Sequence, residues 1–298
     1  MTSIIIGDQT LDYTRHTNGD LPLIFIHGIA SSQHTWLDFP LRFADYGQVI
    51  TLSLPGHYPS RSPTGMRRAT LIDPWVGDIL GEAVERITGG APALLIGHST
   101  GGYAALATAW RNPRLVKGVI SLAGFARGVW SGPLGMAQRL HILGITGVWL
   151  FNALINRNTR SAALVDLAWQ RCFHDKAAFR ACAAYQTARP DIITDLSRMD
   201  ARSLRLWFYQ MRTASDLTPY LPLIAAPVLA IAGKCDHTVP PEQTTIIGHS
   251  VPHGTAILLD DLDHALYMER PEKVERCMRE WMEQLLTGDH HRRCEFGK

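Results

Sequence analysis

The sequence predicts an α/β fold, because short apolar runs that are typical of buried strands lead into turns and then into helical segments. These runs lie at residues 23–26, 93–96, 227–233 and 256–259. The second run passes through a glycine-containing turn into a segment of helical character, and the last precedes a helix expected to begin near Pro271. We therefore expect a sheet whose strands are connected by helices.

The turn after the second run has the sequence Gly-His-Ser-Thr-Gly at residues 97–101. Gly97 and Gly101, two positions on either side of Ser99, remove side chains that would collide in a tight strand-to-helix turn. The serine can then adopt a strained conformation with its oxygen exposed at the helix N-terminus. This pattern predicts a nucleophile, and the simpler alternative is a serine that only caps the helix.

A serine hydroxyl is a poor nucleophile near neutral pH, so the hypothesis also requires amide donors for an oxyanion, a base and an acid. The strand at 23–26 ends in His27, Gly28 and Ile29, and Gly28 allows a tight turn there. The backbone amides of Ile29 and Thr100 are the predicted oxyanion donors. His27 is expected to fix this loop by hydrogen bonding rather than to transfer protons.

The predicted acid and base follow the last two strands. Asp236 comes shortly after the strand at 227–233, at the end where an open parallel sheet places its functional residues. His264 follows the strand at 256–259 and is the predicted base. A structural alternative for Asp236 is a carboxylate that caps the helix expected near Pro240.

Neighbouring residues offer further alternatives. Asp260, Asp261 and Asp263 compete with Asp236 as the acid, although their closeness to His264 in sequence favours a role in shaping its turn. His237, adjacent to the predicted acid, is the second candidate for the base. His98, beside the nucleophile, is expected to pack under the turn.

These motifs resemble those of the α/β-hydrolase-fold superfamily, and in particular its serine esterases and lipases with a helical cap. The chain order Ser99, Asp236, His264 is the order of that family. The resemblance covers residues 1–125 and 222–286. Further similar features are the Leu-Pro-Gly-His turn at 54–57, the Gly-x-x-Asp-x-x-Val-Pro segment at 233–240 and the Asp-His pair at 263–264 before Glu-Arg-Pro at 269–271.

The resemblance implies a mostly parallel central sheet flanked by helices, with an inserted helical cap. The expected divisions are a core at 1–125 and 223–288, a cap at 126–222 and a flexible tail at 289–298. It also implies hydrolysis of carboxylic esters through an acyl-enzyme, with lactones, thioesters, amides and the carbon–carbon bonds of diketones as variants. Serine at position 99 disfavours dehalogenase and epoxide hydrolase chemistry, because those relatives carry aspartate there.

Two positions depart from the pattern of many relatives, which have aspartate where Ser53 stands and glycine where Tyr58 stands. Tyr58 can line the mouth of a pocket. Within the expected cap, the apolar run at 142–151 is too short and too interrupted to span a bilayer, which needs about 20 residues. It predicts a lid helix facing a hydrophobic pocket, with weak contact to a membrane surface as the lesser alternative. The candidate pocket residues are Tyr58, Trp130, Trp149 and Trp207.

Composition is consistent with a compact enzyme. The 298 residues are 46% hydrophobic, and 29 basic against 27 acidic residues leave a net charge of +2, which gives no reason to expect a nucleic-acid partner. The five cysteines contain no Cys-x-x-Cys pair, which argues against a disulfide framework or a zinc site. No cofactor or metal is expected. The first residues, 1–8, indicate a strand rather than a signal peptide, so a cytoplasmic location is expected.

Two other classes of function fit the same motifs. The first is a cofactor-free peroxidase or perhydrolase, which uses the same triad in relatives with a similar turn. The second is a non-catalytic ligand receptor or pathway accessory protein that keeps the pocket for binding. The main prediction is a serine hydrolase that acts on a hydrophobic small molecule.

Overall fold

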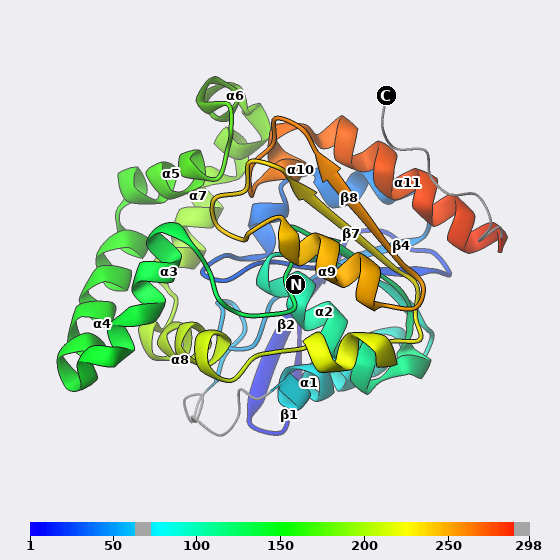
Figure 1. Cartoon of the computed structure of the whole chain (residues 1–298), viewed down its shortest axis with the longest axis horizontal. Helices are drawn as coiled ribbons and strands as arrows, with labels where there is room; N and C mark the ends of the chain where they lie inside the picture. Colours follow the sequence, from blue (N-terminus) through cyan, green and yellow to red (C-terminus); the bar gives the residue numbers. More distant parts are fainter. Residues whose placement is uncertain (63–72, 289–298) are drawn as a thin grey trace.

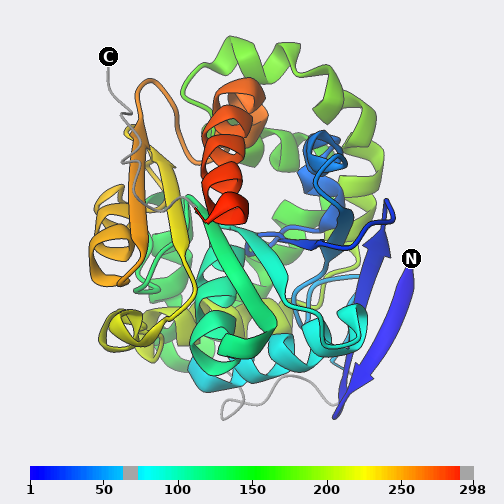
Figure 2. The same cartoon turned by 90° about the vertical axis from the view of Figure 1, so that its right-hand side faces the viewer.

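The computed structural model describes residues 1–62 and 73–288. Its centre is an eight-stranded sheet in the order β1-β2-β4-β3-β5-β6-β7-β8. β1 pairs antiparallel with β2 and β2 with β4, and the remaining pairs are parallel. Figure 2 shows β1 and β2 at one edge and β7 and β8 at the other. The strands are β1 (Thr2–Ile6), β2 (Gln9–Arg15), β3 (Pro22–Ile26), β4 (Gln48–Leu52), β5 (Ala93–His98), β6 (Val116–Leu122), β7 (Val228–Gly233) and β8 (Gly254–Leu259).

The central strands are covered on both faces, as the continuous apolar runs in the sequence require. Every residue of β3, β5 and β7 is buried. A Cβ at Gly118 of β6 would lie 3.0 Å from atoms of Trp281 and Leu285, whereas Ser121 of the same strand lies against Gly102. Because successive strand residues face opposite sides, α11 (Pro271–Thr287) and α2 (Thr100–Arg111) cover opposite faces of the sheet.

The core contains further helices in the segments that connect or follow its strands. They are α1 (Asp73–Thr88), α9 (Glu242–Ser250), the short α10 (Leu266–Glu269) and the 3₁₀ turns η1 (Gln33–Trp36), η2 (Phe39–Phe43) and η3 (Pro113–Leu115). α11 begins at Pro271, as predicted, and the helix expected near Pro240 begins at Glu242. Proline at the first helical position has no amide hydrogen to leave unpaired, which explains the start of α11.

A set of helices lies between β6 and β7, and Figure 1 shows them gathered beside the sheet. These inserted helices are α3 (Gly132–Arg139), α4 (Gly144–Arg160), α5 (Ala162–Arg171), α6 (Lys176–Ala181), α7 (Ala183–Ser197) and α8 (Ala201–Thr213), with η4 (Leu140–Leu143) and η5 (Thr218–Leu223). Residues 177–188, whose composition is typical of a helix, are helical except at Cys182. The backbone at Cys182 turns to an extended conformation, with ψ at 90°, and divides the segment into α6 and α7.

Polar contacts join the inserted helices to the core, and two of them involve α7 and α8. Nδ1 of His34 lies 2.7 Å from the Asp195 carboxylate, and Nε1 of Trp207 donates a hydrogen bond of 2.9 Å to the carbonyl oxygen of Pro55. Trp207 is completely buried, so its indole N–H would be left unpaired without this bond. The contacts hold α7 and α8 against loops that follow β3 and β4.

Candidate active site

Ser99 stands on a sharp turn between β5 and α2. Its φ of 54° is in the region that non-glycine residues rarely adopt, and its amide donates to the carbonyl oxygen of Leu122 at 2.8 Å. A Cβ at Gly97 would lie 2.2 Å from the Gly101 oxygen, and a Cβ at Gly101 would lie 2.0 Å from the oxygen of Ile26. Both glycines are therefore required by the close approach of the backbone, as the sequence predicted.

Asp236 and His264 form a buried pair. Nδ1 of His264 lies 2.8 Å from Oδ2 of Asp236, and the exposed fractions of the two side chains are 6% and 0%. Oδ1 of Asp236 accepts hydrogen bonds of 2.8 Å from the amides of Thr238 and Val239. With the carboxylate ionised, Nδ1 of His264 donates to it, which leaves Nε2 with a lone pair. Through these two hydrogen bonds Asp236 also caps the turn before α9. A carboxylate that caps this turn can therefore hold His264 as well.

His98 connects this pair to the turn that carries Ser99. Its Nε2 donates to the carbonyl oxygen of His264 at 3.0 Å, and the two imidazole rings lie 4.8 Å apart between centroids. Burial, followed by the proximity of His264, lowers the pKa of His98 to about 3. His98 is therefore neutral near neutral pH and packs under the turn, as the sequence predicted. The ends of β5, β7 and β8 thus meet at one place.

The loop after β3 lies against the same turn. A Cβ at Gly28 would lie 3.2 Å from the Cβ of Ser99, so the two backbones are in close contact. Thr100 is the first residue of α2, where an amide has no carbonyl partner within its own helix. The amides of Ile29 and Thr100 thus belong to two segments that meet beside Ser99. Their role as oxyanion donors stays a prediction.

Two buried histidines support this loop. Nδ1 of His27 donates to the Gly28 oxygen at 2.8 Å, and its Nε2 accepts from the Leu54 amide at 3.1 Å. Nε2 of His57 accepts from the Ala30 amide at 3.2 Å. Burial is the main cause that lowers the pKa of both rings, to about 4 for His57. The structure therefore gives His27 the fixing role that the sequence predicted.

The low pKa of His57 predicts a loss of stability in acid. Unfolding returns the pKa to about 6.5, so the unfolded chain takes up protons as the pH falls from 6.5 towards 4 and the folded chain does not. We expect the free energy of unfolding to fall by about 2 kcal/mol between pH 7 and pH 5 from His57 alone. His98 adds to the loss, whereas His34, whose pKa is raised by its hydrogen bond to Asp195, opposes it.

Urea unfolding of the wild type and of His57→Gln at pH 7, 6 and 5 isolates this contribution. The variant should lose less stability than the wild type over the same interval, because glutamine does not titrate. If the free energy of unfolding fell equally with pH in the two proteins, His57 would not be the source of the loss.

The competing residues have other partners. Oδ1 of Asp263 accepts from the amides of His264 and His237, at 2.7 and 3.1 Å, and Oδ2 lies 3.0 Å from Nδ1 of His237. The side chain of His237 is 78% exposed. Asp260 pairs with Lys234 at the surface, 2.6 Å away. Asp263 therefore shapes the turn of His264, as expected, and the base candidate bonded to Asp236 is His264.

Glu269 is a residue that sequence reasoning noted only as part of a motif. It is 4% exposed, and its carboxylate accepts from the amides of Asp175 at 2.6 Å, His174 at 3.0 Å and Asp263 at 3.4 Å. It therefore connects the segment between α5 and α6 to the turn that carries His264. The only signal in the sequence was an acidic residue after the apolar residues 265–268.

The predicted pocket residues fall into two groups. Trp207 and Trp130 are buried, at 0% and 3% exposure, and Tyr58 accepts a hydrogen bond of 2.6 Å from Arg198 of α7. Trp149 is 76% exposed on α4, so the structure does not place it with the two buried tryptophans. The reason is that the buried stripe of α4 runs through other residues, which are Gly147, Phe151, Ile155 and Thr159.

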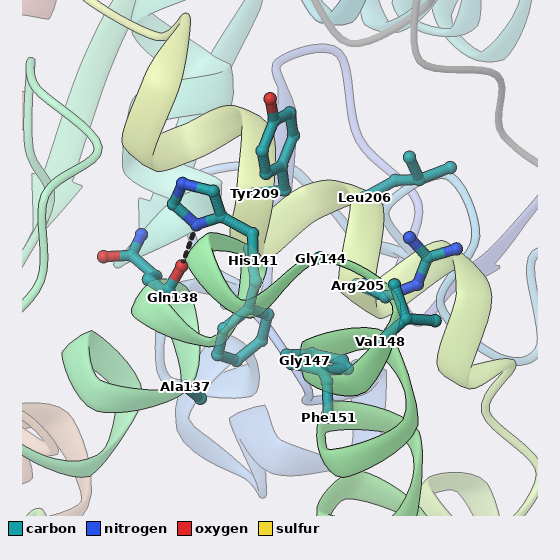
Figure 3. A pocket seen from close by; sticks show the side chains of 11 residues that line it. Ala137, Gln138, His141, Gly144, Gly147, Val148, Phe151, Arg205, Leu206 and Tyr209 are labelled. Carbon is teal, nitrogen blue, oxygen red and sulfur yellow. Dashed lines mark hydrogen bonds between the residues drawn. The ribbon is translucent and has the colours of Figure 1, made fainter.

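A pocket of about 260 Å³ lies between α3, α4 and α8 (Figure 3). Its lining is mostly apolar and includes Gln138, His141 and Arg205, and Nδ1 of His141 donates to the backbone oxygen of Gln138 at 2.6 Å. Ser99, Asp236 and His264 are absent from this lining. The pocket is therefore a feature of the inserted helices rather than of the Ser99 site.

Within residues 1–62 and 73–288, no three His, Cys, Asp or Glu side chains are grouped as a metal site would require. None of the helices in these residues is both long enough and apolar enough to cross a bilayer.

Comparison with known proteins identifies the family. The sequence model of the "Alpha/beta hydrolase family" matches residues 23–276, which is most of the chain. The chain belongs to the alpha/beta hydrolase family. The order and pairing of its eight strands agree with this assignment, and its solved neighbours include esterases, lipases and an enol-lactonase.

The chain shares low sequence identity with individual proteins, but the similarity extends over most of its length. It is 23% identical to the (E)-2-((N-methylformamido)methylene)succinate hydrolase of Acinetobacter baylyi, covering 93% of this chain and 95% of that protein. It is 24% identical to a pimeloyl-[acyl-carrier protein] methyl ester esterase of Yersinia pseudotuberculosis, over 85% and 90% of the two chains. The enol-lactonase of Burkholderia xenovorans superposes with a TM-score of 0.72 at 21% identity, over 95% and 100%. This chain is thus a family member with hydrolase and esterase relatives.

Proposed function

We propose that this protein is a serine hydrolase that cleaves a carboxylic ester, or a related acyl bond, of a hydrophobic small molecule. The observation that carries the proposal is the buried His264–Asp236 pair, 2.8 Å apart, which His98 connects to the strand-to-helix turn that carries a serine at a φ of 54°. The names of the relatives support it, since they describe hydrolysis of esters, a lactone and substituted succinates.

In the first half-reaction, Ser99 Oγ attacks the carbonyl carbon of the substrate and its proton passes to Nε2 of His264. The carbonyl electron pair moves onto the oxygen, which becomes negatively charged. Asp236 stabilises the imidazolium and keeps the ring oriented. Its two backbone hydrogen bonds hold the carboxylate in place, so little reorganisation is needed when the charge on the imidazole develops.

The amides of Ile29 and Thr100 donate to the oxyanion. When the tetrahedral intermediate collapses, the bond to the leaving group breaks, and the leaving oxygen takes the proton from Nε2 of His264. The acid part of the substrate remains as an ester on Ser99. A water molecule then loses a proton to His264 and attacks this ester, and the proton returns to Ser99 Oγ as the acid departs.

Residues 126–222 act as a cap over this reaction. The contacts of Trp207 with Pro55, His34 with Asp195 and the 174–175 amides with Glu269 support this role, because they tie the inserted helices to loops beside the triad. A cap that excludes water strengthens the hydrogen bonds to the oxyanion.

Covalent labelling tests the proposal directly. An organophosphonate with a fluorescent tag should react with the wild type, and mass spectrometry of the digested protein should find the adduct on the peptide that contains Ser99. A metal chelator should give no protection. An adduct on another residue, or tight binding of small molecules without labelling or turnover, would favour the receptor function over the hydrolase.

The apolar surroundings of the inserted helices predict a preference for larger acyl groups. Phe208 lines the cavity of about 260 Å³ between α3, α4 and α8, and we expect the acyl group of the substrate to lie against apolar side chains of these helices. Each additional methylene contributes about 0.8 kcal/mol, so two to four more carbons should raise kcat/KM by roughly tens-fold. p-Nitrophenyl esters from C2 to C8 measure this trend, and a flat or falling series would contradict a roomy apolar pocket.

A further inference from the structure

The outer side of α4 and the turn before it expose a group of large apolar side chains. The group, here called the apolar patch, consists of Ile142, Leu143, Ile145, Trp149 and Leu150, which are between 48% and 76% exposed. Single exposed apolar residues are common in soluble proteins, but a contiguous apolar patch marks a site of interaction. Figure 1 shows α4 at the outer edge of the molecule, away from β7 and β8.

The patch is not needed for the packing of α4. Residues four apart lie on the same side of a helix, and the row that packs inward is Gly147, Phe151, Ile155 and Thr159. The row on the opposite side is exposed and consists of Ile145, Trp149, Ala153 and Arg157. α4 therefore has one apolar face that packs on its neighbours and a second one, in its first turns, that faces solvent.

The turn before α4 extends this second face. A Cβ at Gly147 would lie 1.7 Å from the carbonyl oxygen of Leu140, so η4 packs directly on the first turns of the helix. Ile142 and Leu143 of η4 are thereby held beside Ile145. A shallow groove of about 450 Å³ runs along the exposed side and is lined by Ile145, Thr146, Trp149, Leu150 and Ala153.

Positive charge accompanies the patch. Arg157 and Arg160 continue the exposed side of α4 towards its C-terminus, and Arg139 precedes η4. In the part of the chain that the structure describes, no ion pair engages these three arginines. The sequence contains no Asp or Glu from residue 86 to residue 165. The apolar patch is therefore bordered by cations without neighbouring acidic residues on the same segment.

We propose that the apolar patch docks this protein on the surface of an anionic lipid bilayer. The aliphatic side chains enter the boundary of the acyl chains, the indole of Trp149 lies at the level of the headgroups, and Arg157 and Arg160 contact lipid phosphates. Such docking is separate from the proposed reaction, because it determines the location of the protein rather than the bond that it cleaves.

A second copy of the chain fits this surface less well. A two-fold contact that pairs the two α4 helices in parallel would place Arg157 against Arg157. An antiparallel contact along the full length of α4 would place the apolar first turns against the cationic last turns. An anionic lipid surface matches both the apolar first turns and the cationic last turns of α4, because it offers acyl chains below a layer of negative charge.

Cosedimentation with vesicles tests the proposal. The wild type should bind phosphatidylcholine vesicles that contain phosphatidylglycerol, bind pure phosphatidylcholine vesicles much less, and be released at high salt. The double variant Ile145→Ser, Trp149→Ser should bind at least about tenfold more weakly, because two large apolar side chains no longer insert. Arg157→Gln with Arg160→Gln should weaken binding by about fivefold for each cation removed.

A control variant removes one exposed apolar side chain and one exposed arginine outside the apolar patch. Leu223 is 63% exposed and Arg114 is exposed in η3, and the double variant Leu223→Ser, Arg114→Gln should bind as the wild type does. Circular dichroism and thermal unfolding verify that all variants are folded.

The proposal is overturned if the wild type does not bind anionic vesicles. It is also overturned if the control and patch variants bind the vesicles equally. Polyglutamate beads provide negative charge without lipid, and equal retention of the wild type and the Ile145→Ser, Trp149→Ser variant on them, without vesicle binding, would overturn it as well. Dimerisation that depends on Ile145 and Trp149 in the absence of vesicle binding would instead assign the patch to a second copy.

Discussion

Replacing Ser99 with alanine should abolish turnover of any ester substrate and leave the fold intact. The variant lacks the atom that forms the acyl-enzyme, and the loss of a triad member costs on the order of 10⁴-fold or more in kcat. The positive φ of residue 99 is maintained by the hydrogen bond that its amide donates to the carbonyl oxygen of Leu122 and by the glycines around it, and alanine keeps the same Cβ. Thermal unfolding should therefore show a similar Tm while p-nitrophenyl ester hydrolysis falls to background.

Ser121→Ala is the matched control for this prediction. Ser121 is a completely buried serine on β6, directly beside Gly97 in the sheet, and its hydroxyl has no hydrogen-bond partner among residues 1–62 and 73–288. The same chemical change in the same layer of the protein should leave activity close to that of the wild type. Near-normal turnover by Ser99→Ala, or an equal loss in Ser121→Ala, would contradict the mechanism.

The sequence predicted the fold well because strand–turn–helix units leave local signals. The runs at 23–26, 93–96, 227–233 and 256–259 correspond to β3, β5, β7 and β8. Glycine spacing around Ser99 reports a backbone contact that only glycine permits, which is why this turn could be located without a structure. The family resemblance and the α/β-hydrolase fold are confirmed by the family match and by the sheet.

The inserted helices were harder to predict for physical reasons. α4 is apolar on two sides, so periodicity could not tell which side packs inward, and the candidate pocket residue Trp149 lies on the exposed side rather than with the buried Trp130 and Trp207. The alanine-rich segment 177–188 favours a helix throughout and contains no glycine or proline, so no local signal reports the break at Cys182. The contacts of Asp195 with His34 and of Glu269 with the 174–175 amides join residues far apart in sequence, so no local pattern reports them.

Replacing Asp236 with asparagine should lower kcat by on the order of 10⁴-fold with a small change in KM. The oxygen of asparagine can still accept the two hydrogen bonds from Thr238 and Val239, so the turn should persist. The amide group of the new side chain then faces Nδ1 of His264, and both are donors in the active tautomer. The imidazole escapes this repulsion by moving its proton to Nε2, where it can no longer accept the proton of Ser99.

Two further asparagine variants separate this explanation from a general effect of lost charge. Asp260→Asn removes an exposed carboxylate that pairs with Lys234 and should leave kcat nearly unchanged. Asp263→Asn perturbs the turn of His264 through its amide contact, and its loss of activity should be smaller than that of Asp236→Asn. Steady-state kinetics of the three variants, with urea unfolding as the check on folding, decides between the carboxylates. If Asp263→Asn were the more damaging substitution while all three proteins remained folded, Asp236 would not be the acid that orients His264.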